Sequence, residues 1–182
     1  MDKTIRADFD NIRSNDGQVQ NKAYFALIDA TDKPVNWAYD VWDELFEGLK
    51  HKDNHVRAIS AQVLSNLAKS DLKERMLKDF PKLLKVTKDE RFVTARHCMQ
   101  SLWKVGVAGE KQQKTYMDGL EKRFKECAKE KNCTLIRYDI LISMQNVYNQ
   151  VKDEAIKEKA LALIETEKDI KYQKKYKTVW KK

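Results

Sequence analysis

The sequence predicts an all-α protein, a solenoid of about five stacked helical hairpins. Three observations support this class: an apolar pattern with helical spacing recurs along the chain, an amphipathic segment precedes each copy, and turn-forming residues are scarce. The 182 residues include 5 Gly and 2 Pro, too few for an all-β chain with many tight turns. A repeat of a few tens of residues is typical of solenoids and related arrays.

The recurring pattern occupies four segments, residues 16–31, 53–68, 91–106 and 133–148. Their first stripe positions are Val19, Val56, Thr94 and Ile136, which lie 37, 38 and 42 residues apart. Apolar or small residues follow 4, 8 and 11 positions later in each segment, and these offsets draw one stripe down an α-helix. We therefore expect four equivalent helices that hide the same face.

Another amphipathic segment precedes each of these helices. Residues 35–50, 71–86 and 114–129 are such partners, and residues 3–13 are expected to pair with the first copy. Residues 153–166 and 168–180 complete a last pair. The chain is thus predicted to be a single domain over residues 1–182, with repeats at approximately 3–31, 35–68, 71–106, 112–150 and 153–180. Thr87 to Glu90 has the pattern of a capping box, and Gly106 that of a helix terminator.

Two of the repeated segments carry a family resemblance. Residues 49–68, LKHKDNHVRAISAQVLSNLA, resemble the second half of a HEAT repeat, and residues 94–106, TARHCMQSLWKVG, resemble the same half with its terminal glycine. The similarity extends over roughly residues 15–150. It implies an armadillo-type, right-handed superhelix whose second helices line a concave surface. It implies no single activity, because function depends on the site and not on the fold.

Basic residues on the second helices are the candidate binding residues. They are Lys22, Arg57, Arg96, Lys104 and Arg137, and Trp103 is an aromatic candidate beside them. Arg57 and Arg137 occupy the same repeat position, directly after the first stripe residue. In HEAT-like proteins an arginine there commonly bonds to an acidic residue of the adjacent turn. A structural role and a basic stripe for phosphate or acidic peptide are both open.

The net charge of +8 is concentrated at the C-terminus. Residues 168–182 hold seven Lys and one Asp, or +6, which leaves +2 for the rest of the chain. Lys171, Lys174, Lys175 and Lys177 alternate there with aromatic residues. The segment is either a last helix that docks its aromatic side chains on the end of the solenoid or a basic-aromatic contact with nucleic acid.

Catalytic, metal-binding and cofactor-binding motifs are not recognised in the sequence. His51 and His55 are four residues apart but lie across a predicted turn without a third ligand nearby. His97 and Cys98 are adjacent, so a helix splays them about 100° apart. Gly106 to Lys111 lacks the preceding strand of a phosphate-binding loop. We expect no enzyme activity, no metal and no cofactor.

Cellular context follows from what the sequence lacks. No stretch of 18 apolar residues is present, so no membrane partner is expected. No secretory signal is visible, and three cysteines do not make a disulfide framework, so a cytoplasmic location is predicted.

Three functions remain open at this point. The favoured one is a non-enzymatic scaffold that binds a protein partner through the concave surface. The second is nucleic-acid binding, by architectural similarity to the HEAT-like DNA alkylation-repair glycosylases, although no aromatic, carboxylate and arginine set of that family aligns here. The third is a subunit that extends a larger helical assembly through the ends of its own array.

Overall fold

The computed structural model describes residues 1–181, and every regular element in that range is helical, which confirms the all-α prediction. The first half contains α1 (Lys3–Asn11), α2 (Gly17–Ala30), α3 (Ala38–Gly48), α4 (Asn54–Leu67), α5 (Arg75–Lys85), α6 (Phe92–Ser101) and α7 (Trp103–Gly106). The second half contains α8 (Glu110–Glu126), α9 (Cys133–Val151), α10 (Glu154–Glu165) and α11 (Ile170–Val179). Short 3₁₀ turns follow α4, α5 and α8 at Ala68–Ser70, Val86–Lys88 and Cys127–Lys129.

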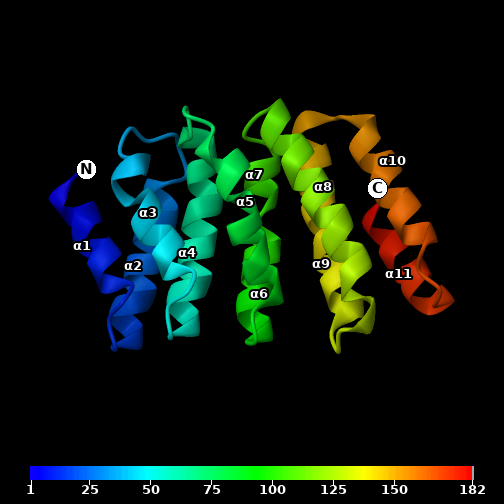
Figure 1. Ribbon diagram of the computed structural model, residues 1–182, viewed down its shortest axis with the longest axis horizontal. Helices are drawn as coiled ribbons and strands as arrows, with labels where there is room; N and C mark the ends of the chain where they lie inside the picture. The colour runs from blue at the N-terminus through cyan, green and yellow to red at the C-terminus, as the bar shows by residue number, and fades with distance from the viewer. Residues whose placement is uncertain (182) are drawn as a thin grey trace.

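The helices stand in pairs, in chain order, along the long axis of the molecule, so that the two termini lie toward opposite ends (Figure 1). Within the pairs α1 packs on α2, α3 on α4, α8 on α9 and α10 on α11. Between pairs, α2 contacts α4, α4 contacts α6, α6 contacts α9, and α9 contacts α11. The four helices that share the apolar pattern therefore lie next to one another, followed by α11.

Apolar residues of the repeated stripe form the core between these helices. Leu27, Leu64 and Leu102 share one repeat position and are completely buried. Val19 is an exception and is 37% exposed. It lies on α2, which has one second-helix neighbour, α4, among residues 1–181, so the stripe is less completely buried there.

Aspartates set the beginning of many helices. The side chains of Asp16, Asp53, Asp153 and Asp169 accept hydrogen bonds from backbone N–H groups in the first turns of α2, α4, α10 and α11. Such caps satisfy donors that the helix itself leaves free. Three of these aspartates begin second helices, so the caps fix the helices that form one side of the row.

The link before α6 differs from the predicted capping box. Arg91 is the N-cap residue of α6, and the Thr87 hydroxyl donates to the Leu84 carbonyl at 2.7 Å. Asp89 accepts from the Arg91 backbone N–H at 2.8 Å. The capping-box prediction was wrong because α6 begins at Phe92, later than the box requires, and the Thr87 hydroxyl donates to Leu84 instead of capping the helix.

Gly106 ends α7, but not through a left-handed conformation, since none of the glycines in residues 1–181 has a positive φ of that kind. A Cβ atom there would lie 2.7 Å from Val147 and 2.9 Å from Tyr116. The residue therefore permits close packing of α7 on α8 and α9. No described helix is both long and apolar enough to cross a membrane.

Candidate binding surface on the second helices

A hollow of about 420 Å³ lies between α2, α4 and α6. Its lining includes Asn21 and Tyr24 of α2, His55, Ile59 and Gln62 of α4, and His97 of α6. These side chains point to the side of the row formed by the second helices, which we call the second-helix face and define as the exposed surface of α2, α4, α6, α9 and α11. The hollow combines aromatic, amide and imidazole groups.

Some of the polar side chains in the hollow are hydrogen-bonded to other side chains, and others are not. The Tyr24 hydroxyl donates to the Gln62 side-chain oxygen at 2.9 Å, and burial raises the pKa of Tyr24. His55 lies 3.1 Å from the Asp53 carboxylate. His97 is exposed. Amide and imidazole groups of this kind can donate to and accept from a peptide backbone.

The neighbouring Cys98 is turned away from His97 and into the core. Its thiol is completely buried, contacts the Leu83 carbonyl at 3.5 Å, and has a pKa that burial raises. A buried neutral thiol is a poor nucleophile. His97 and Cys98 therefore do not form a nucleophile and base pair.

Exposed apolar residues extend the second-helix face on both sides of the hollow. Phe25 of α2, Val93 of α6 and Leu135 of α9 are 61%, 63% and 37% exposed. Phe25 follows Asn21 by four residues and Val93 precedes His97 by four, which places each pair on one side of its helix. The face is consequently a mixed apolar and polar surface.

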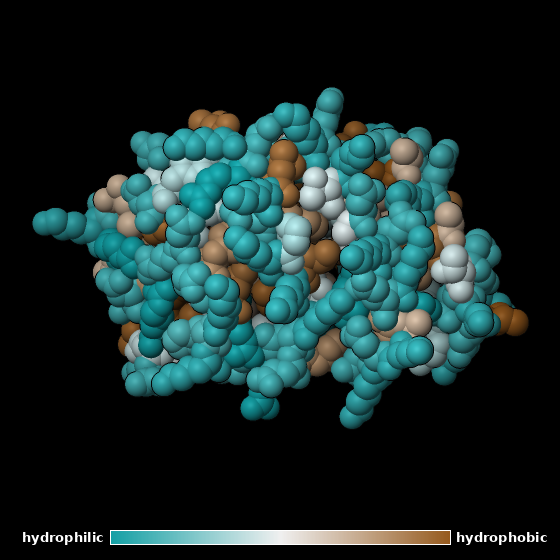
Figure 2. All heavy atoms as spheres, in the orientation of Figure 1, coloured by the Kyte–Doolittle hydropathy of each residue, from teal (hydrophilic) through white to brown (hydrophobic). Residues whose placement is uncertain are grey.

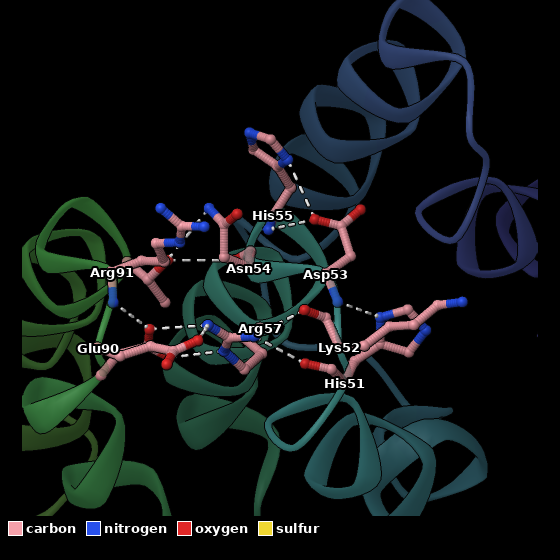
Figure 3. Close-up of polar contacts among 10 residues, drawn as sticks. His51, Lys52, Asp53, Asn54, His55, Arg57, Glu90 and Arg91 are labelled. Carbon is pink, nitrogen blue, oxygen red and sulfur yellow. Dashed lines mark hydrogen bonds and ion pairs between the residues drawn. The ribbon is translucent and has the colours of Figure 1, made fainter.

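The predicted binding residue Arg57 is buried, and its side chain joins the turn before α4 to the turn before α6 (Figure 3). Its Nε and Nη2 donate to the two carboxylate oxygens of Asp89 at 2.6 and 2.8 Å. Its Nη1 donates to the carbonyls of His51 and Lys52 at 2.9 and 3.1 Å. Burial raises the pKa of Asp89, but hydrogen bonds from Arg57 and Arg91 outweigh it and hold the pKa below the usual value.

Arg137, at the same repeat position, has an equivalent arrangement. Its Nη1 donates to Glu167, in the link between α10 and α11, at 2.7 Å. Its guanidinium also lies 4.7 Å from the centre of the Phe124 ring. As with Arg57, the acidic partner belongs to the following pair of helices. Both arginines therefore join neighbouring pairs.

Arg96 and Lys104 are also engaged. Arg96 Nε donates to Asp139 of α9 at 2.7 Å, and its side chain is 38% exposed. Lys104 donates to the Asn66 side-chain oxygen and has a pKa lowered by burial and by Lys69. Each links one helix of the row to the next.

Of the two remaining candidates on the second helices, Trp103 is half-buried and packs against the core. Lys22 is exposed. Four of the six predicted binding residues, Arg57, Arg96, Lys104 and Arg137, thus have partners within the protein.

The C-terminal helix α11 combines a docked side and a basic side. Tyr176, Val179 and Trp180 are 0%, 6% and 7% exposed. The predicted tail lysines Lys171, Lys174 and Lys175 are exposed, whereas Lys177 pairs with Glu165 at 2.6 Å. Lys175 lies over the Tyr138 ring of α9 at 5.1 Å. Lys182 is outside the described residues.

The exposed residues Phe25, Val93, His97 and Leu135 were not among the sequence-predicted site residues. Val93 and Leu135 each directly precede the first stripe residue of their helix, and His55 occupies the same repeat position. Large side chains next to the buried stripe, compared at equivalent positions of successive repeats, are the sequence signal for such a surface.

Comparison with known proteins does not identify a family. No family model matches the chain, and no curated protein matches it. Among solved structures, the crystal structure of an engineered protein from the Northeast Structural Genomics Consortium is similar, with 14% sequence identity, coverage of 98% of this chain and 95% of that chain, and a TM-score of 0.49.

Proposed function

We propose that this protein is a non-enzymatic scaffold, a right-handed superhelix of five HEAT-like hairpins that binds a protein partner in the cytoplasm through its second-helix face. In this proposal the second-helix face is the concave surface. The observation that carries it is the exposure of Phe25 and Val93 on either side of the hollow between α2, α4 and α6.

The composition of the face supports a protein ligand. Apolar side chains that stay exposed next to partly unpaired polar groups are typical of protein interaction sites. The face runs across five helices of successive pairs, and an extended surface of this kind suits a segment of another chain. In the orientation of Figure 1, hydrophilic residues cover most of the surface, and apolar residues show between them (Figure 2).

The basic residues give less support to the nucleic-acid alternative. Arg57, Arg96 and Arg137 are paired with Asp89, Asp139 and Glu167. Phosphate contact at these arginines would have to break those ion pairs. The exposed lysines of α11 are still able to contact phosphate, so the experiment below also tests for binding of nucleic acid.

The test uses substitutions at the most exposed apolar residues of the face. Phe25→Asp and Val93→Asp add charge to the proposed interface at side chains that are mostly exposed. Leu72→Asp is the matched control, because Leu72 is 91% exposed and lies in the link before α5, away from this face. Each purified variant is used to capture proteins from cell extract, with and without nuclease.

We expect wild type and Leu72→Asp to retain a common protein that Phe25→Asp and Val93→Asp lose, with no effect of nuclease. Equal capture by all four chains would refute the proposed face. Loss of capture on nuclease treatment, with a steep decrease of binding as salt rises, would instead favour nucleic acid. Circular dichroism on each variant separates loss of binding from unfolding.

A further inference from the structure

Two of the three cysteines lie against each other in the link between α8 and α9. Cys127 begins the 3₁₀ turn after α8, and Cys133 is the first residue of α9. Their sulfur atoms are 3.0 Å apart, and both thiols are free. A disulfide requires about 2.05 Å between sulfurs, so an approach of roughly 1 Å would close the bond. Residues 128–131 of the link are exposed, and Glu130 among them is held by two hydrogen bonds from the buried Arg123.

The two thiols differ in environment. Cys127 is completely buried, whereas Cys133 is half-buried. Burial, together with the hydrogen bond to Cys133, raises the pKa of Cys127 to about 12. Cys127 therefore remains a thiol at neutral pH, and Cys133 is the sulfur that a reagent in solution reaches first.

A helix N-terminus and an arginine lie beside the two cysteines. Cys133 lies at the N-terminus of the 19-residue helix α9, where the helix dipole favours negative charge. Arg137 follows four residues later on the same side of the helix. Its Nε donates to the Phe124 carbonyl at 3.3 Å, and the Cys127 thiol donates to the same oxygen at 3.2 Å. A cation is thus held beside the two sulfurs.

We propose that Cys127 and Cys133 are a dithiol redox site that a small-molecule disulfide of the glutathione type oxidises to an intramolecular disulfide. The Cys133 thiolate attacks one sulfur of the reagent, forms a mixed disulfide and releases one glutathione thiolate. Cys127 then gives its proton to a thiolate in solution and attacks the Cys133 sulfur, which releases the second glutathione. Two protein thiols are oxidised, and one disulfide is reduced to two thiols, so electrons and protons balance.

Oxidation also changes the contacts of the link. It removes the thiol proton that Cys127 donates to the Phe124 carbonyl, the acceptor shared with Arg137. Arg137 in turn holds Glu167 of the following pair. The two cysteines therefore lie next to a contact that joins α9 to the C-terminal helices.

The test incubates the full chain with oxidised glutathione, blocks free thiols under denaturing conditions and determines the mass of the chain and its peptides. We expect a monomer in which Cys98 alone is alkylated, a peptide cross-linked between Cys127 and Cys133, and full reversal by dithiothreitol. Alkylation of all three cysteines, or cross-linking between chains, would overturn the proposal.

Two variants identify the order of the steps. Cys127→Ala removes the second nucleophile, so a stable glutathione adduct should accumulate on Cys133. Cys133→Ser should leave Cys127 unmodified in the folded protein. An adduct on Cys127 in the latter variant, or none on Cys133 in the former, would refute the assignment of Cys133 as the attacking thiol. Should Cys127→Ala unfold, the half-buried Cys133→Ser variant still decides the order.

Discussion

The guanidinium of Arg96 on α6 is paired with the carboxylate of Asp139 on α9, with 2.7 Å between Nε and Oδ2 and 3.0 Å between Nη2 and Oδ1. The Asp139 side chain is 3% exposed, so the arginine is the charge that permits burial of this carboxylate. A residue expected to contact a ligand is thus part of the contact between two second helices. The same holds for Arg57 and Arg137 at the turns.

Replacement of Arg96 tests this structural role. Arg96→Ala leaves the buried Asp139 with a long 3.4 Å contact to Gln100, and we expect the free energy of unfolding to fall by about 2 kcal/mol, as for loss of a hydrogen bond to a charged group. Urea denaturation measures the change. Lys22→Ala is the control, because an exposed lysine should change stability by less than about 0.5 kcal/mol. Equal stability of the two variants would contradict the role.

The pair formed by Arg57 and Asp89 predicts acid sensitivity. Asp89 has a pKa below its usual value in the folded protein, so the unfolded chain takes up the proton first as pH falls. The stability that this carboxylate contributes is present above about pH 4 and is lost below it. Thermal melts at several pH values should show Asp89→Asn to be less stable than wild type near neutrality, with a smaller loss in acid. An unchanged acid dependence would count against the pair.

The sequence predicts the positions of the helices better than it predicts the contacts between them or the exposed surface. Val56, Ser60 and Leu64 recur with a helical period, and the same period in each of the other repeated segments places the helices in the sequence. The partners Asp89 and Asp139 lie 32 and 43 residues from their arginines. To predict these ion pairs, one must know how each pair of helices packs on the next. The sequence does not specify this packing, because the repeats differ in length.

The exposed face was not predictable for a related reason. Phe25 and His97 are ordinary members of amphipathic helices in the sequence, and Val93 adjoins a core position. Their exposure depends on which neighbouring helix covers each side, and therefore on the order and spacing of the whole row. Comparison of equivalent repeat positions could have raised Val93 and Leu135 as candidates, but not shown that they remain uncovered.

Gly106 permits a second test of packing. Alanine has the higher helix propensity by about 1 kcal/mol, so a helix-terminating or neutral glycine would tolerate Gly106→Ala. The Cβ would meet Val147 at 2.7 Å and the Tyr116 ring at 2.9 Å, and we expect a net loss of about 1–3 kcal/mol from overpacking. Gly17→Ala is the matched control, because a Cβ added at Gly17 would meet no atom within 4 Å. A Gly106→Ala variant more stable than wild type would contradict this packing role, because it would show that α7 can move away from α8 and α9 without a cost in free energy.

Substitutions on the two sides of α11 distinguish the two interpretations of the basic C-terminal segment. Tyr176 is completely buried and donates its hydroxyl to the Thr134 carbonyl at 3.0 Å, so Tyr176→Ala should lower the free energy of unfolding by about 3 kcal/mol. Charge reversal of Lys171, Lys174 and Lys175 together should lower the melting temperature much less, because these side chains are exposed and their contact with α9 is that of Lys175 with the Tyr138 ring. The same triple variant is compared with wild type for binding to single-stranded DNA at two salt concentrations.

Docking as the main role of α11 predicts equal, weak binding by both proteins. Salt-sensitive binding by wild type alone would assign the lysines to phosphate contact, with the buried tyrosine serving to hold them in place.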